Sequence, residues 1–365
     1  MASSPEAAGL EALSSPAISG SARGVVSALL VFGDSLSDVG NAFAQRGAAA
    51  FPCPPHWRGR RCDGPVWVEH LAARLGLPPL LPSLAGGSNH AFGGARSGRG
   101  LSAKGMPNLL EQVEGFLGEG RAAEVAGLRP AAGPDGLMPR SGSVGPGPGA
   151  PPSSSAAGHW RSPAVGPDPS PQNLAAQIGS GSGLLSADPA TALVVLRAGA
   201  NDYLDAPPSP SVAEAVNSHL LEAMSRLAAA GFRRFLVPSE LPWGWAPLEL
   251  PGVQQEQRLA LNALITAQNR ALRASLTDLA AGRQLLVAQP DAAALLLAVR
   301  DDPAAHGFSE VDRPRLSGGG LEAAEAVPEA SGWLWWDSWG HLSSAFHRQL
   351  AERALESLRG CGLAG

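Results

Sequence analysis

Cysteine and long apolar runs are both scarce in this sequence, and each scarcity excludes a class of protein. The 365 residues include only Cys53, Cys62 and Cys361, an odd number without the CxxC spacing of a zinc site. Cys53 and Cys62 are close enough in the chain to pair, but so sparse a set is not a disulfide framework, and we expect reduced thiols. No stretch of roughly 18 apolar residues occurs, so the sequence predicts no transmembrane segment.

Basic charge is also limited. The formal net charge is −5, and Lys104 is the only lysine among 27 basic residues. Nucleic acids and anionic membrane surfaces both require a basic face on their partner, so we expect neither as a partner of this chain. Residues 1–26 contain no apolar run of signal-peptide length. We interpret them as a flexible lead of a soluble, intracellular protein, either cytoplasmic or organellar.

The chain does contain an alternation of apolar strands and amphipathic helices. Each predicted strand is almost continuously apolar, which is typical of a parallel sheet covered by helices on both faces. Ligands of such sheets bind beyond the carboxyl ends of the strands. The predicted strands lie within 27–33, 89–98, 191–203, 232–242 and 283–289, where 89–98 is a short strand that runs into a Gly-rich turn and 191–203 ends in a polar turn. The predicted helices cover 64–76, 106–120, 211–231, 254–282 and 343–359.

One long segment interrupts this alternation. Residues 129–186 are rich in Pro, Gly, Ser and Ala and have few of the apolar side chains that offset the entropy of ordering. We therefore predict a single domain over 27–360, interrupted by a disordered insertion at 129–186. A docking role for this insertion is an alternative.

A Gly-Asp-Ser sequence ends the first predicted strand. Ser35 is expected to begin a helix there, with its hydroxyl exposed at the edge of the sheet and its amide at a helix N-terminus, where an oxyanion is favoured. The alternative is that Ser35 only caps a helix. A serine hydroxyl is a weak nucleophile and needs a base, and His341 is a candidate, with Asp337 four residues earlier to orient its ring.

Two further positions are candidates for stabilising negative charge on a substrate oxygen. Asn201, in the sequence GAND at a predicted strand end, offers a side-chain NH₂ group. The adjacent glycines Gly93 and Gly94 allow the backbone to approach a ligand closely and present an N–H. The order Ser, Gly, Asn, Asp/His along one chain indicates a nucleophilic hydrolase.

Four blocks resemble those of the GDSL lipase/esterase branch of the SGNH hydrolase superfamily. FGDSLSDVGN (32–41) is similar to the block with the nucleophile, and NHAFGGARSG (89–98) to the block with an oxyanion-hole glycine. GAND (199–202) resembles the block with the second oxyanion donor, and WDSWGHLSSAFH (336–347) the block with the base. The resemblance covers roughly residues 28 to 358, apart from the insertion.

The resemblance implies a flavodoxin-like three-layer α/β/α sandwich and ester hydrolysis through an acyl-serine, with no cofactor and no metal. It implies a small-molecule or lipid ester as substrate. The implied catalytic residues are Ser35, Asp337 and His341, and the implied oxyanion hole consists of the Ser35 amide, Gly94, with Gly93 as second choice, and Asn201.

Several alternatives accompany this reading. The same acyl-enzyme serves a carbohydrate acetylesterase or an acyltransferase, and a non-catalytic binding or scaffold protein is a further possibility.

The family usually separates the final pair as D-x-x-H, whereas Asp337 and His341 are one residue further apart, which would rotate Asp337 away from the ring. We interpret His347 as structural, although Asp337, His341 and His347 are conceivable metal ligands.

Aromatic residues are concentrated near the last block. Trp336 and Trp339 flank Asp337, and Tyr203, the only tyrosine, directly follows the Asn-Asp pair. We expect these three side chains to line the substrate site, where an apolar wall would suit an acyl chain. The alternative is that they pack in the core beneath a loop.

Overall fold

The computed structural model of the chain describes residues 26–47, 52–125, 188–205, 207–248, 254–317 and 332–364. The predicted insertion at 129–186 and the predicted lead, except Val26, lie outside these residues. No helix within the described residues is both long and apolar enough to cross a membrane.

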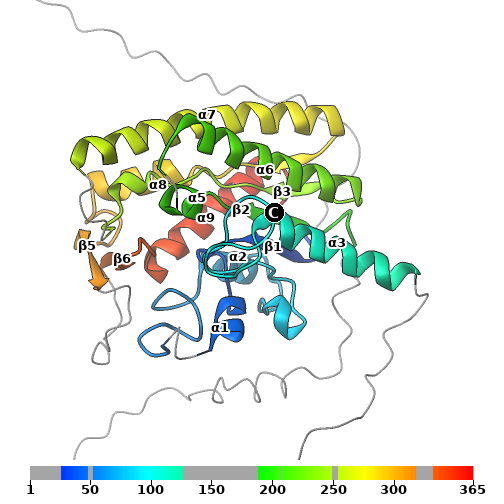
Figure 1. Cartoon of the computed structure of the whole chain (residues 1–365), viewed down its shortest axis with the longest axis horizontal. Coiled ribbons are helices and arrows are strands. Elements are labelled where there is room, and N and C mark those ends of the chain that lie inside the picture. The colour runs from blue at the N-terminus through cyan, green and yellow to red at the C-terminus, as the bar shows by residue number, and fades with distance from the viewer. Residues whose placement is uncertain are drawn as a thin grey trace, which may run out of the picture.

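The main sheet consists of four parallel strands in the order β1-β2-β3-β4 (Figure 1). Almost every side chain in the strands is apolar, as the sequence predicted, and β1, β2 and β3 are fully buried, whereas β4 at the end of the sheet is partly buried. Each strand is shorter than its predicted range. Their bounds are β1 (Leu29–Gly33), β2 (Leu193–Arg197), β3 (Arg234–Leu236) and β4 (Leu286–Ala288).

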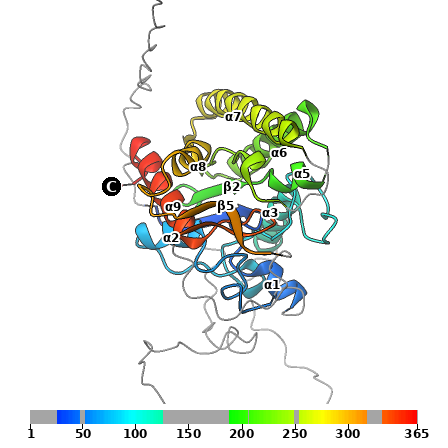
Figure 2. The ribbon, with the colours of Figure 1, turned by 90° about the vertical axis from the view of Figure 1, so that its left-hand side faces the viewer.

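Helices cover both faces of this sheet, which gives the three-layer α/β/α sandwich that the sequence predicted (Figure 2). Side chains of β1 alternate between the faces, because successive residues of a strand point in opposite directions. Leu29 and Val31 pack in the core with α2, α8 and α9, whereas Leu30 and Phe32 pack with α3 and α6. The helices are α1 (Asn41–Arg46), α2 (Trp67–Arg74), α3 (Leu109–Val125), α5 (Ala200–Asp205), α6 (Pro210–Ala229), α7 (Gln255–Arg283), α8 (Ala292–Asp301) and α9 (Ser344–Gly360), with 3-10 turns η1 (Ser83–Ala85) and η2 (Trp243–Trp245).

Helix termini follow local sequence signals in part. Ser209 accepts a hydrogen bond from the amide of Val212 and precedes a proline at the first position of α6, which fixes the start of that helix. Gly231 follows its end with φ of 103°, as predicted for a helix stop. The expected stop at Gly282 is wrong, because α7 continues to Arg283 and Gln284 takes the left-handed conformation instead.

A second sheet was not predicted. Strands β5 (Glu310–Leu316) and β6 (Trp333–Asp337) pair in parallel. The last residue of β6 is Asp337, which belongs to the last of the four sequence blocks. The short helices α1 and α5 and the helix α8 were also missed.

Two local expectations about the first half of the chain are wrong. Residues 89–98 form no strand, only isolated bridges from Asn89 to Val31 and to Pro82, and the side chain of Asn41 binds the carbonyl groups of Asn89 and Ala91. Ser35 does not begin a helix. The Asp34 carboxylate accepts from the amide of Leu36 and closes a tight turn, so the next helix, α1, begins only at Asn41.

Candidate active site

Residues from the four sequence blocks converge beyond the carboxyl ends of the strands. Ser35 lies two residues after β1, Asn201 lies in the first turn of α5 after β2, and His341 lies four residues after the end of β6. These three residues and Gly94 line one cavity of about 260 Å³. The placement is the one expected for a ligand site of a parallel sheet.

A chain of hydrogen bonds joins Ser35, His341 and Asp337. Nε2 of His341 lies 2.9 Å from Oγ of Ser35, and Nδ1 lies 2.8 Å from each carboxylate oxygen of Asp337. The ring therefore bridges a hydroxyl and a carboxylate that come from distant parts of the chain.

The turn from Asp337 to His341 accommodates the additional residue between them. The carbonyl of Asp337 accepts from the amide of Gly340 at 3.1 Å, and the carbonyl of His341 accepts from the amide of Trp336 at 2.7 Å. Gly340 has φ of 86°, a conformation that side chains rarely adopt. The chain thus folds back on β6, and the longer spacing does not carry Asp337 away from the ring.

Nearby charges and hydrogen bonds determine where the protons of Asp337 and His341 lie. Burial alone would raise the pKa of Asp337, but the charge and hydrogen bond of His341, with the charge of Arg61, hold it below its ordinary value. The ionised carboxylate, which also accepts from the amides of Trp339 and His341, requires a proton on Nδ1 of the ring. Nε2 is then free to accept the proton of the Ser35 hydroxyl.

The backbone amides of Ser35 and Gly94, both of which line the cavity, have no acceptor among the described residues. The amide of Gly93, in contrast, donates to the carboxylate of Asp38 at 2.8 Å. Of the two glycines, Gly94 is therefore the one with an N–H available to a ligand.

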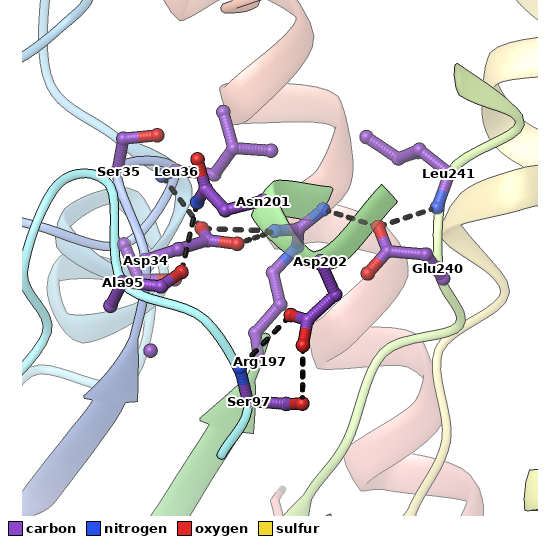
Figure 3. Close-up of polar contacts among 12 residues, drawn as sticks. Asp34, Ser35, Leu36, Ala95, Ser97, Arg197, Asn201, Asp202, Glu240 and Leu241 are labelled. Atoms are coloured by element: carbon purple, nitrogen blue, oxygen red, sulfur yellow. Dashed lines mark hydrogen bonds and ion pairs between the residues drawn. The ribbon is translucent and has the colours of Figure 1, made fainter. Parts of the chain in front are cut away.

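The first turn of α5 anchors the loop that contains Gly94. Nδ2 of Asn201 donates to the carbonyl of Ala95 at 2.9 Å, and this bond uses one of its two hydrogens. The carboxylate of Asp202 accepts from the amide and the hydroxyl of Ser97 at 2.9 and 2.8 Å (Figure 3). Asn201 thus lies against the glycine loop and lines the cavity with its second N–H still available.

A buried ionic network, which the sequence did not reveal, supports the serine turn. Figure 3 shows the Arg197 guanidinium between two carboxylates: it donates to both oxygens of Asp34 at 3.0 and 2.9 Å and to Glu240 at 3.0 Å. Glu240 also accepts from the indole of Trp243 at 2.9 Å. All three charged residues are buried. The network joins the ends of β1 and β2 to the loop after β3 and fixes the residue directly before Ser35.

Of the three predicted substrate-lining aromatics, only Trp339 lines the cavity. Tyr203 is buried and its hydroxyl binds Gln268 on α7, because the α5 helix turns this side chain away from Asn201. Trp336 is buried within the core, and its indole N–H donates to Nδ1 of His56 at 3.0 Å. The expectation for Tyr203 and Trp336 is corrected accordingly.

The other residues that line the cavity include two groups. Arg46, Arg61 and Lys104 contribute positive charge. The apolar group comes mainly from α5, η2 and the residues that follow it, and includes Leu204, Trp243 and Leu248.

The remaining histidine and cysteines contribute no ligand set. His347 is buried on α9, and burial lowers the pKa of its ring well below the ordinary value, so it is neutral. All three cysteines are free thiols. Within the described part of the chain, no group of three or more His, Cys, Asp or Glu side chains is arranged to hold a metal ion.

Comparison with known proteins identifies a family and a relative. The family model described as GDSL-like Lipase/Acylhydrolase matches residues 29–354. A stretch of 49 residues, 13% of this chain, is 41% identical to the phosphatidylcholine-sterol acyltransferase of Aeromonas hydrophila and spans 15% of that protein.

Proposed function

Because this chain belongs to the GDSL-like lipase/acylhydrolase family, we propose that it is an esterase that cleaves carboxylic esters through an acyl-serine intermediate on Ser35. Membership of the family supports an enzyme of hydrolysis or acyl transfer. The hydrogen-bond chain from Asp337 through His341 to Ser35 is the observation that carries the more specific proposal.

In the acylation half of the reaction, Oγ of Ser35 forms a bond to the ester carbonyl carbon while its proton passes to Nε2 of His341. Asp337 stabilises the imidazolium that results. The tetrahedral intermediate collapses when the bond to the alcohol oxygen breaks, and that oxygen takes the proton from Nε2. Water then repeats the sequence on the acyl-serine and releases the acid with Ser35 restored.

Negative charge on the carbonyl oxygen requires donors that already point at it. The amides of Ser35 and Gly94 meet this requirement because neither donates to another described residue. The second N–H of Asn201 is the third donor. Replacement of one such donor typically reduces kcat by about 100- to 1000-fold.

Acyl transfer to an alcohol is a second candidate, favoured by the match to a relative that is named an acyltransferase. An alcohol would replace water in the second half of the reaction, with the same residues in the same roles. The two reactions are separated by adding an alcohol to the assay and measuring the ratio of new ester to free acid.

The test of the main proposal uses p-nitrophenyl esters with wild-type protein and Ser35→Ala. We expect hydrolysis by the wild type and a loss of several orders of magnitude in the variant. Ser211→Ala, which changes an exposed serine on α6, is the matched control and should retain full activity. Equal rates for wild type and Ser35→Ala would refute the proposal.

The acyl chain length that the protein prefers distinguishes the remaining alternative functions. Rates with acetyl and octanoyl p-nitrophenyl esters distinguish an acetylesterase from an enzyme that accepts an acyl chain. The apolar side chains of Leu204, Trp243 and Leu248 in the cavity lining support the longer chain. A binding or scaffold protein would turn over neither ester.

A further inference from the structure

Positive charge is concentrated in the cavity although the chain as a whole is acidic. Arg46 at the end of α1, Arg61 before α2 and Lys104 before α3 all line it. The guanidinium carbon of Arg61 lies 4.9 Å from the ring centre of Trp339, and Nζ of Lys104 lies 5.1 Å from the same ring centre. Trp339 thus brings two cations together at the site, within a chain of formal net charge −5.

In the described part of the chain, no carboxylate shares the cavity surface with these cations. None of the described residues that line the cavity is acidic. The side chains of Arg46 and Lys104 form no ion pair or hydrogen bond with any other described residue. Asp337 and Asp205 lie outside the lining and offset part of this charge. Each also has another partner: Asp337 binds His341, and Asp205 lies 4.0 Å from Arg96.

The three cations repel one another when no anion is bound. Arg61 is buried, whereas Arg46 and Lys104 are exposed at the cavity. Desolvation and the charges of Arg61 and Arg46 lower the pKa of the Lys104 ammonium group, although the charges of Asp205 and Asp337 act in the opposite direction. A bound anion would relieve this repulsion.

The cations adjoin the groups expected to act on the ester. A Cβ atom on Gly94 would lie 2.8 Å from Cδ of Lys104, so the lysine stem packs directly on the glycine whose amide faces the cavity. Leu204, Trp243 and Leu248 supply the apolar part of the lining. The same cavity therefore has contacts for a charged group and for an apolar chain.

We infer that the substrate is an ester that also carries an anionic group, a phosphate or a carboxylate, and that Lys104, Arg46 and Arg61 bind this group. The inference rests on the proposed esterase function, since it specifies the substrate class of the same site. Guanidinium and ammonium groups both bind such oxyanions by charge-assisted hydrogen bonds.

The first experiment compares matched esters in wild-type protein. One pair is 1-butyrylglycerol 3-phosphate and 1-butyrylglycerol, in which the phosphate is on the alcohol. The other pair is the p-nitrophenyl monoester of succinate and p-nitrophenyl butyrate, in which the carboxylate is on the acyl group. We expect kcat/KM for the charged member of at least one pair to exceed that of the neutral member about tenfold. The favoured pair identifies the part of the ester that carries the charge.

Variants then assign the preference to the cations. Lys104→Met and Arg46→Met should each reduce the charged-to-neutral ratio of kcat/KM, and added salt should reduce it as well. Arg270→Met removes an equal charge from the exposed surface of α7 and should leave the ratio unchanged. A wild-type ratio near one for both pairs, or a ratio unaffected by both cavity variants, would overturn the inference.

A binding measurement keeps this result separate from the esterase proposal. Calorimetric titration of Ser35→Ala with 1-butyrylglycerol 3-phosphate and with 1-butyrylglycerol requires no turnover. We expect tighter binding of the phosphate ester, and weaker binding when Lys104→Met is added. Tighter binding without turnover by the wild type would refute only the esterase proposal. The same titration is made with the p-nitrophenyl monoester of succinate and p-nitrophenyl butyrate. Equal affinity for the charged and neutral members of both pairs would refute the substrate assignment, and so would an affinity for inorganic phosphate equal to that for the phosphate ester.

Discussion

Ser35 and His341 meet at the cavity, but the two regions that hold them differ in construction. On the serine side, the buried Arg197 joins Asp34 to Glu240 and so connects three segments of the main sheet. On the histidine side, Asp337 and His341 lie four residues apart in one turn at the end of β6. The serine is positioned by long-range ionic contacts and the histidine by local backbone geometry.

Because of this difference, we expect substitutions on the serine side to affect mainly stability and substitutions on the histidine side to affect mainly catalysis. The ions of the serine side are desolvated, and loss of one partner leaves an uncompensated buried charge. The turn of the histidine side is closed by backbone hydrogen bonds that do not depend on the charge of Asp337. Substitutions on the two sides should therefore produce different defects, and three predictions test this.

The largest effect is expected from Asp337→Asn. Asparagine retains an oxygen that accepts from the backbone amides but does not stabilise an imidazolium, and it favours the wrong ring tautomer. We expect kcat to fall by about 10,000-fold with little change in the free energy of unfolding. Esterase kinetics and denaturant titration measure the two quantities, with the exposed Asp278→Asn on α7 as control. A decrease in the free energy of unfolding as large as the increase in the activation free energy would contradict the contrast between the two sides.

Arg197→Met should give the opposite pattern. The substitution leaves the carboxylates of Asp34 and Glu240 buried without their cation, and we expect a loss of about 3–5 kcal/mol in the free energy of unfolding. Denaturant titration measures it, and Arg270→Met is the matched control. An unfolding free energy equal to that of the wild type would mean that the network does not stabilise the serine side.

The smallest predicted effect is a loss of stability at acidic pH, because each side buries a neutral histidine. On the serine side, His90 stacks on Phe32 of β1 with ring centres 5.2 Å apart, and burial lowers its pKa to about 4. On the histidine side, burial and the charge of Arg61 lower the pKa of His56 to about 3, although Asp337 acts in the opposite direction.

The unfolded chain binds a proton at His90 below its ordinary pKa of about 6.5, whereas the folded protein does not until pH 4. Stability should therefore fall as the pH drops from 6.5 toward 4, with no contribution from His90 above that range. We expect His90→Phe to reduce the loss of unfolding free energy between pH 7 and pH 5 by about 2 kcal/mol. Melting curves at the two pH values test this, and a pH dependence identical to that of the wild type would contradict it.

Local sequence predicted those parts of the site whose geometry is local. The order of strand, Gly-Asp-Ser turn and helices placed Ser35 at the sheet edge, and the last block placed Asp337 beside His341 despite their unusual spacing. The three-layer fold was predictable because the strands are continuously apolar. These features depend on residues close together in the chain.

The parts that escaped prediction depend on pairs that are far apart. The ion pair of Asp34 and Arg197 spans 163 residues, and nothing in either segment indicates the other. Lys104, although unique in composition, was not assigned to the site because its loop has no motif. Tyr203 and Trp336 were placed in the site because of neighbouring motif residues, but helix and strand directions turn them into the core.

The separation of 306 positions between Ser35 and His341 also matters during synthesis of the chain. Under the proposed mechanism, the Ser35 hydroxyl has no base until β6 and the turn that follows it have been translated and have docked. The proposed esterase activity therefore cannot begin before the segment that holds His341 has reached Ser35.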